Sequence, residues 1–290
     1  MAALEFPSEL NLSVEYVDRN VEEGRGDDPA LVYQDERYTY REVLQNVSKA
    51  AHLLRELGLE PEQRVLLMVG DHPEFVWFWF AAVRMGAIVS AVNPDGKPEE
   101  LAYYLDYTRS RILVAEERIL GRTVHPEKAR WLKGVVACRG EGGPLPSKTV
   151  RWEERRAELP DFFEPEKTHA EDVCNMLYTG GSTGFPKAVL HRHLDFLYNT
   201  HTYGIPILGF KKGDVTVSAS RLFFGYALGT NLLFPFRVGA TVALFPEKPT
   251  PERILEEVTR RKATHLVSVP TMINAMVQFE PEPGKYDWSS

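Results

Sequence analysis

The chain of 290 residues has few of the features that mark a secreted, membrane-bound or nucleic-acid-binding protein. Its two cysteines, Cys138 and Cys174, lie far apart without metal-site spacing, so we expect reduced thiols in a cytoplasmic protein. No cationic segment followed by a cleavage site opens the sequence, and so no secretory signal is predicted. The formal net charge of −7 argues against a nucleic-acid or anionic-membrane surface, since both need clustered basic residues.

A long hydrophobic run is also missing. The most apolar stretch, residues 75–83, ends at Arg84, well short of the ~20 residues that cross a bilayer. Pro73 and Glu74 are helix-start signals in front of it, and we therefore expect a buried helix that ends near Gly86. The hydrophobic share of 43% is enough for a buried core, and the length allows one large or two modest domains.

Strand and helix patterns alternate along the first half of the chain. Residues 30–33 and 37–40 predict a β-hairpin, and Thr39 with Glu42 forms a capping box for a helix that stops at Gly58. Apolar strands and further helices then follow in turn, at residues 64–69, 75–83, 88–92, 98–107 and 111–115. This order predicts an α/β fold with mostly parallel sheets flanked by helices.

Residues 139–170 interrupt this alternation with glycines, prolines and a charged run, a composition typical of a surface connection. We therefore expect a first α/β subdomain at residues 1–138 and a second, incomplete one at residues 171–290. The second subdomain contains strand patterns at 239–244 and 264–271 and an amphipathic helix at 251–261.

The segment 177–187, Leu-Tyr-Thr-Gly-Gly-Ser-Thr-Gly-Phe-Pro-Lys, is the most informative part of the sequence. Glycines allow backbone N–H groups to approach a ligand, and successive amides form a site for an anion. Lys187 adds a mobile positive charge that suits phosphate. Strand patterns at 172–178 and 187–191 predict that the loop joins two strands and wraps a polyphosphate. A turn that binds nothing is the alternative, which the Pro-Lys ending on an apolar strand disfavours.

The spacing excludes two familiar phosphate loops. The loop of the P-loop NTPases has lysine directly after glycine and a hydroxyl residue next, whereas two residues separate Gly184 from Lys187 here and Ala188 follows. A kinase-like NTPase is therefore disfavoured. The dinucleotide fingerprint fails as well, because Gly180 and Gly181 are adjacent.

The pattern Tyr-Thr-x-Gly-Ser-Thr-Gly-x-Pro-Lys at 178–187 resembles the phosphate loop of the adenylate-forming (AMP-binding) enzymes, which include acyl-CoA and aryl-CoA ligases. Gly180 replaces the family's usual Ser or Thr and removes one phosphate donor. Ala188 replaces a usual Gly and slightly stiffens the loop's exit. The resemblance covers essentially the whole chain and is strongest to benzoate-type CoA ligases, which share the stretches at residues 18–20 and 24–27.

The resemblance implies roles for individual residues. The phosphates of ATP would bind to Thr179, Gly180, Gly181, Ser182, Thr183, Gly184 and Lys187, of which Lys187 is also the catalytic candidate beside the leaving pyrophosphate. The acyl group would lie near Phe224, Gly225 and Tyr226, in a segment where Arg221 replaces the lysine of benzoate-type ligases. From the residues alone, these bunched aromatic side chains would be interpreted as core.

The implied activity is ATP-dependent conversion of benzoate or a substituted benzoate, through an acyl-adenylate, to its CoA thioester. The implied partners are the carboxylic acid, ATP with Mg²⁺, and CoA, without nucleic acid or membrane; a homodimer is left open. The family's main Mg²⁺ motif, its ribose-binding aspartate and its small C-terminal domain would follow Ser290, so we expect this chain to be inactive alone. A nucleotide-binding fragment without turnover and a ligase for a non-aryl acid are the alternatives.

Two other site types are not predicted. His191, His193 and His201 lack an acidic or cysteine ligand at metal-site spacing, so no metal ligands are assigned. Ser182 lacks the Gly-x-Ser-x-Gly elbow of a hydrolase nucleophile.

Overall fold

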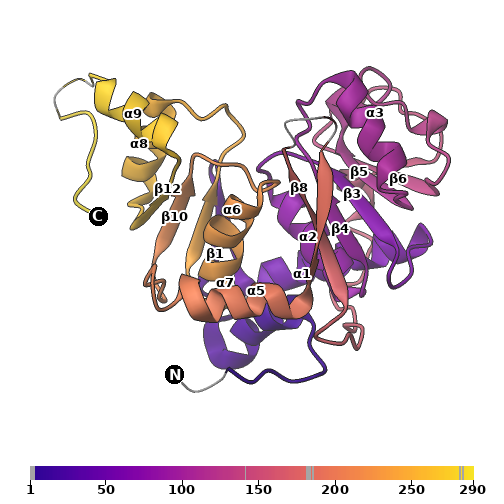
Figure 1. The fold of residues 1–290 in the computed structure, drawn as a ribbon, viewed down its shortest axis with the longest axis horizontal. Helices are drawn as coiled ribbons and strands as arrows, with labels where there is room; N and C mark the ends of the chain where they lie inside the picture. The colour runs from indigo at the N-terminus through magenta and orange to yellow at the C-terminus, as the bar shows by residue number, and fades with distance from the viewer. Residues whose placement is uncertain (1–3, 141, 181–183, 185, 281, 283) are drawn as a thin grey trace. The chain divides into compact units, whose positions relative to one another are not determined.

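A computed structural model describes residues 4–140, 142–180, 184, 186–280, 282 and 284–290 of the chain (Figure 1). The chain forms two compact units that interleave along the sequence. The first unit contains the residues up to Glu15 together with Leu44–Gly70 and Glu74–Asp195. The second unit contains Tyr16–Val43, Asp71–Pro73 and Phe196–Ser290.

Within the described residues, the first unit is built on a seven-stranded sheet. The edge strand β9 runs antiparallel to β8, whereas the other strand pairs are parallel. Continuous apolar strands such as β3 suit a parallel sheet that is buried on both faces. In spatial order the strands are β7 (Thr149–Arg151), β6 (Gly134–Cys138), β5 (Ile112–Glu116), β3 (Arg64–Met68), β4 (Ile88–Ala91), β8 (Val173–Thr179) and β9 (Lys187–Arg192).

Helices cover the first sheet. Leu101, Tyr104 and Leu105 of α3 pack into a core with side chains of β3, β5 and β6. The helix α2 is apolar on all sides and is buried, as the sequence predicts, with Trp77 and Trp79 almost inaccessible. The helices with residues in this unit include α1 (Tyr40–Glu56), α2 (Pro73–Arg84), α3 (Pro98–Tyr107), α4 (Trp152–Arg155) and α5 (His193–Asn199).

Within the described residues, the second unit is built on a five-stranded sheet. The strands β12, β10, β11 and β1 pair in parallel, and β1 forms an antiparallel hairpin with β2. The pairing of β1 with β11 places Leu31 opposite Val242, far apart in the sequence. In spatial order the strands are β12 (His265–Val267), β10 (Val215–Ser218), β11 (Thr241–Leu244), β1 (Pro29–Tyr33) and β2 (Glu36–Thr39).

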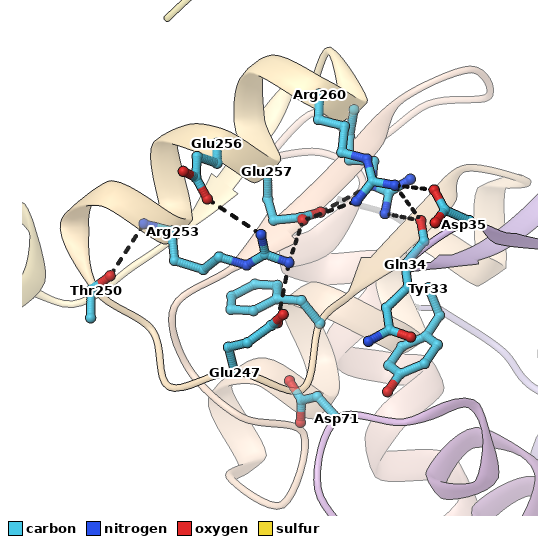
Figure 2. Close-up of polar contacts among 12 residues, drawn as sticks. Tyr33, Gln34, Asp35, Asp71, Glu247, Thr250, Arg253, Glu256, Glu257 and Arg260 are labelled. Carbon is cyan, nitrogen blue, oxygen red and sulfur yellow. Dashed lines mark hydrogen bonds and ion pairs between the residues drawn. The ribbon is translucent and has the colours of Figure 1, made fainter. Parts of the chain in front are cut away.

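The helix α8 closes the core of the second unit. Its Ile254 packs with Val217 of β10 and Ala243 of β11. One turn after Ile254, the buried Glu257 lies beside Arg253 in a cluster of charged side chains (Figure 2). Helices of this unit include α6 (Gly225–Leu228), α7 (Phe234–Val238), α8 (Pro251–Arg261) and α9 (Pro270–Gln278).

The start of α1 forms as the sequence predicts. The N–H of Thr39 donates to Glu42 Oε2 over 2.8 Å, and the N–H of Glu42 donates to Thr39 Oγ1 over 3.2 Å. Each side chain thus satisfies a backbone donor that the first helical turn leaves without a partner. The predicted helices at 98–107 and 251–261 are confirmed at the same residues.

The grouping of the strands differs from the consecutive subdomains expected from the sequence. The segment 139–170, expected as a surface connection, contributes β7 to the first sheet. Its Trp152 is fully buried and meets the ring of Phe78 edge-on, with ring centroids 5.1 Å apart. The strands β8 and β9 also join the first sheet, and the hairpin of β1 and β2 joins the second. The grouping depends on pairing between strands that are distant in the sequence, and local sequence patterns do not show which strands pair.

None of the helices in the described part of the chain is both long enough and apolar enough to span a bilayer. Cys138 and Cys174 are buried free thiols. Burial raises the pKa of both thiols, so they remain protonated at neutral pH.

Candidate functional site

The loop after β8 lies at the carboxyl end of the parallel pair β4 and β8, where ligands bind in open α/β sheets. The chain returns from the loop as β9, with Tyr178 opposite Ala188 and Thr179 opposite Lys187. The predicted strand–loop–strand unit is therefore confirmed. Four loop residues lie outside the described part of the chain: Gly181, Ser182, Thr183 and Phe185.

The described residues of the loop leave room for an anion. Thr179, Gly180, Gly184 and Lys187 are all exposed. A Cβ atom placed on Gly180 or Gly184 would meet no atom of the described residues within 4 Å, so the space beside both glycines is open. The hydroxyl of Thr179 donates a long hydrogen bond of 3.5 Å to the carbonyl of Lys187, across the base of the loop. The described residues of the loop are therefore accessible to solvent.

Tyr178 fixes the point at which the chain leaves the sheet for the loop. Its hydroxyl lies 2.6 Å from Ser90 Oγ of β4, and its ring meets Tyr104 of α3 edge-on, with ring centroids 4.6 Å apart. Burial raises the pKa of Tyr178 to about 12, so the phenol is protonated at neutral pH. A neutral, hydrogen-bonded side chain thus anchors the start of the loop.

Two further tyrosines, Tyr103 and Tyr107, reach the end of the loop from α3. They form hydrogen bonds with the backbone of Pro186 and Ala188, on both sides of Lys187. Neither tyrosine belongs to a motif that the sequence makes visible. Their four-residue spacing indicates a shared helix face, but it does not tell which part of the chain that face meets.

The three acyl-site candidates lie in the second unit, at the start of α6, whereas the phosphate loop belongs to the first unit. The side chains of Phe224 and Tyr226 are 55% and 50% exposed, and so they are not core residues. The hydroxyl of Tyr226 donates to the carbonyl of Ser268 over 3.3 Å. The candidate segment follows β10, and Ser268 follows β12, so both lie at the carboxyl ends of paired parallel strands. Gly225, the first residue of α6, stands between Phe224 and Tyr226 in the sequence and has no side chain.

A buried carboxylate holds the chain just before these candidates. Asp71 Oδ1 accepts the N–H of Leu222 over 2.9 Å, and Asp71 Oδ2 lies 3.6 Å from Arg221 Nη1. Burial raises the pKa of Asp71 to about 6, against the opposing effect of the Arg221 charge. Arg221 also donates to the carbonyl of Phe245 over 2.7 Å. The guanidinium of Arg221 therefore has enough donors to bind two segments at once.

The histidines considered in the sequence analysis have other environments. His193 is buried, and its Nδ1 accepts the N–H of Leu12 over 3.1 Å. Burial lowers the pKa of His193 to about 4, so it is neutral at physiological pH. The Nδ1 of His191 lies 4.0 Å from the carboxylate of Asp195. In the described parts of the chain, no three histidine, cysteine or carboxylate side chains gather as metal ligands.

A pocket of about 460 Å³ opens beside α3. It is lined by residues of α3 and of the segment 122–130, away from the described residues of the phosphate loop. The charged residues of the lining are Glu99 and Asp106 together with Arg122, Lys128 and Arg130. The mixed charge of the lining does not favour one sign of ligand.

Comparison with known proteins shows the same family over nearly the whole chain. The sequence profile described as AMP-binding enzyme matches residues 17–290. The chain is 33% identical over 277 residues to the benzoate–CoA ligase of Thauera aromatica, covering 95% of this chain and 51% of that protein. It is 31% identical over 303 residues to an acetyl-coenzyme A synthetase of Xanthobacter autotrophicus, covering 95% of this chain and 46% of that protein.

The fold agrees with a solved member of the same group. The crystal structure of the anthranilate CoA ligase AuaEII in complex with anthranoyl-AMP matches with a TM-score of 0.91 and 28% identity, over 98% of this chain and 54% of that chain. The chain therefore spans about half the length of the relatives that it matches. The profile match and the α/β fold together show that the chain belongs to the AMP-binding enzyme family.

Proposed function

We propose that the full-length protein containing this chain uses ATP to activate a carboxylic acid as an acyl-adenylate and then transfers the acyl group to CoA. The loop between β8 and β9 carries this proposal, because it presents open glycines and the exposed Lys187 at the carboxyl end of a parallel strand. Membership in the AMP-binding family supports the same assignment. The proposal concerns the longer protein, since the chain spans about half the length of its relatives.

The loop would bind the β- and γ-phosphates of ATP. The open space beside Gly180 supports this proposal, and the exposed residues Thr179 and Lys187 would offer a hydroxyl and an ammonium as donors. Ser182 and Thr183 of the same loop would supply two further hydroxyl donors. Because Thr179 and Lys187 are paired across the base of the loop, the lysine charge would remain beside the leaving pyrophosphate. Donors that are fixed before the reaction stabilise charge as it develops on phosphate oxygens.

In the proposed reaction, a carboxylate oxygen bonds to the α-phosphorus of ATP, and the bond to the bridging oxygen breaks with release of pyrophosphate. The sulfur of CoA then bonds to the acyl carbon, and AMP leaves. Mg²⁺, when bound, would neutralise charge on the phosphates. Its main ligands are expected in the family pattern beyond this chain, and the described residues contain no cluster of three metal-ligating side chains.

The acyl group would lie beside Phe224, Gly225 and Tyr226. Two exposed rings around a glycine favour a flat ring through stacking and shape, whereas a long flexible chain would lose more conformational entropy on binding. The similarity to a benzoate–CoA ligase and to an anthranilate CoA ligase supports an aryl acid. We therefore propose benzoate or a small substituted benzoate as the substrate.

An acid without a ring is the second candidate substrate. The similarity to an acetyl-coenzyme A synthetase favours it, because the two identities differ little. A protein that binds a nucleotide without turnover is the remaining alternative, since a phosphate loop alone is sufficient for binding.

Exchange of labelled pyrophosphate into ATP tests the reaction. We expect the full-length protein to catalyse this exchange only when a carboxylic acid is present, because pyrophosphate must react with an acyl-adenylate. ATP binding without exchange for any acid would support the nucleotide-binding alternative. Formation of ADP in place of AMP would indicate a kinase-like NTPase.

A panel of carboxylates tests the substrate. We expect benzoate and substituted benzoates to support faster exchange than octanoate or acetate. Tyr226→Ala should raise the KM for the aryl acid more than the KM for ATP. Octanoate or acetate exceeding every aryl acid would contradict the aryl assignment and leave the adenylation chemistry intact.

A further inference from the structure

Two tyrosines of α3 bind the backbone on either side of Lys187. The rings of Tyr103 and Tyr107, one helical turn apart, stack with their centroids 5.0 Å apart. The hydroxyl of Tyr103 donates to the carbonyl of Pro186 over 3.0 Å. The N–H of Ala188 donates to the hydroxyl oxygen of Tyr107 over 3.3 Å. The residues before and after the lysine are therefore bound to the same helix.

These contacts lie at the edge of the sheet. Within the described residues, β9 has a neighbouring strand only on the β8 side, and alternate backbone groups of an edge strand lack a strand partner. Pro186 moreover has no N–H to donate. Tyr103 and Tyr107 thus provide hydrogen-bond partners where no strand does, at the point where the chain leaves a glycine-rich loop.

The helix that carries these tyrosines is itself well anchored. Leu101 and Leu105 of α3 are buried in the core of the first unit, and Tyr104 contacts Tyr178 at the start of the loop. Both ends of the phosphate loop therefore contact one helix. A loop that is held at both ends has fewer conformations to lose when it binds a ligand.

We propose that Tyr103 and Tyr107 are positioning residues of the phosphate site, which hold the backbone around Lys187 so that its ammonium is presented to the polyphosphate. This inference rests on the proposed function, because it takes ATP as the ligand of the loop. Both phenols belong to the unit that contains the loop, whereas the acyl candidates belong to the other unit. Loss of the hydroxyls should therefore impair the use of ATP and spare the use of the acid. Tyrosines that only pack α3 would affect stability alone.

The variants Tyr103→Phe and Tyr107→Phe remove one hydroxyl each and keep the stacked rings. In the pyrophosphate exchange assay with the full-length protein, we expect the KM for ATP to rise about 2- to 12-fold in each variant, the range for loss of one neutral hydrogen bond. The KM for the carboxylic acid should not change. Tyr203→Phe is the matched control, because it removes a hydroxyl from a ring that is 44% exposed in the second unit.

A double-mutant cycle with Lys187→Ala tests whether the tyrosines act through the lysine. If they position its ammonium, Tyr103→Phe and Tyr107→Phe should change the KM for ATP by much smaller factors in the Lys187→Ala background than in the wild type. A purely structural role would give the same factors in both backgrounds and would overturn the inference.

Hydrogen exchange gives a readout that is independent of turnover. The amide of Ala188 should exchange faster in Tyr107→Phe than in the wild type or in Tyr203→Phe, because its acceptor is lost. If all three tyrosine variants exchanged pyrophosphate into ATP at the wild-type rate and with the wild-type KM for ATP, this inference would be overturned and the proposed function would stand. A wild-type protein that exchanges pyrophosphate with no acid would overturn the proposed function, and the inference with it.

Discussion

Lys187 carries the charge on which the proposed phosphate site depends. Lys187→Ala in the full-length protein removes the ammonium and leaves the hydroxyl of Thr179 and the loop backbone in place. A hydrogen bond to a charged group contributes about 1.5–3 kcal/mol, so we expect pyrophosphate exchange to fall roughly 10- to 150-fold. Initial rates at saturating ATP and carboxylic acid measure this effect.

The control for this prediction is Lys167→Ala, which removes an exposed lysine of the same unit. It should leave the exchange rate unchanged. Wild-type exchange by Lys187→Ala at saturating ATP would show that the loop holds a different ligand.

The protonation state of Asp71, which contacts the chain just before the acyl candidates, is expected to make the stability of the fold depend on pH. Its side chain is buried, accepts the N–H of Leu222 and faces the guanidinium of Arg221. Burial raises the pKa of Asp71 in the folded protein to about 6, from an ordinary value of 3.8. The folded state therefore favours the protonated acid. The resulting stabilisation is fully present below about pH 4 and is lost as the pH rises through about 6.

Asp71→Asn removes this titration and keeps an acceptor for Leu222. Between about pH 4 and pH 7, we expect the free energy of unfolding of the variant to rise relative to the wild type by up to about 3 kcal/mol. Urea unfolding at several pH values measures the difference, and Asp161→Asn serves as a control at an exposed position. A difference that does not vary with pH would contradict a raised pKa.

At the scale of elements, the phosphate loop is followed by the strand β9 rather than by a helix. A helix would place the positive end of its dipole behind the phosphates, as in P-loop proteins. Without that dipole, the positive charge near the described loop residues comes from Lys187, which is why a single substitution is expected to have a large effect.

The helix α8 is held by charges as well as by its apolar face (Figure 2). Glu257 is fully buried, and its Oε2 accepts the Nε–H of Arg261 over 3.0 Å. Its Oε1 lies 3.0 Å from Arg253 Nη2, an ion pair without hydrogen-bond alignment. Arg253 also pairs with Glu247 and with the partly exposed Glu256. The buried carboxylate thus balances more than one guanidinium.

Glu257→Ala should lower the free energy of unfolding by about 3–5 kcal/mol, because buried guanidinium groups lose their counter-ion. Glu256→Ala on the same helix removes an exposed ion pair, and we expect a loss of at most about 1 kcal/mol. Guanidinium chloride unfolding of both variants measures the two effects. Equal effects would show that Glu257 is not the centre of the cluster.

At the scale of the whole molecule, Asn20 has a structural role. The Nδ2 of Asn20 donates to the carbonyls of Tyr16 and Phe236, each over 2.8 Å, and its Oδ1 accepts from Arg25 Nε over 2.7 Å. These contacts join distant parts of the second unit. Asn20 therefore contributes to the fold of the second unit.

A polypeptide limited to these 290 residues should form no acyl-CoA. The chain spans about half the length of its relatives, and the family's main Mg²⁺ motif, its ribose-binding aspartate and its small C-terminal domain are expected outside it. Thioester formation from benzoate, ATP, Mg²⁺ and CoA tests this expectation, with the full-length protein as the positive control. Synthesis by the purified 290-residue polypeptide at a comparable rate would show that those motifs are dispensable.

Most of the individual elements could be predicted from the sequence. The capping box of Thr39 and Glu42, the apolar helix α2 and the two strands around the loop depend on side chains close together in the chain. Local hydrogen bonding and hydrophobic periodicity determine such features, and both are visible in a short segment. The resemblance to the adenylate-forming enzymes then depended on one loop whose residues are consecutive.

Only the tertiary structure decided which elements share a sheet and which side chains meet the loop. The pairing of β1 with β11, the burial of Trp152 and the contact of Tyr107 with Ala188 join residues that are distant in the sequence. Such contacts leave no local pattern, because a strand or a helix face has the same composition whichever partner it meets. The sequence therefore determined the two strands that flank the loop, and the packing of α3 against the end of the loop determined what holds it.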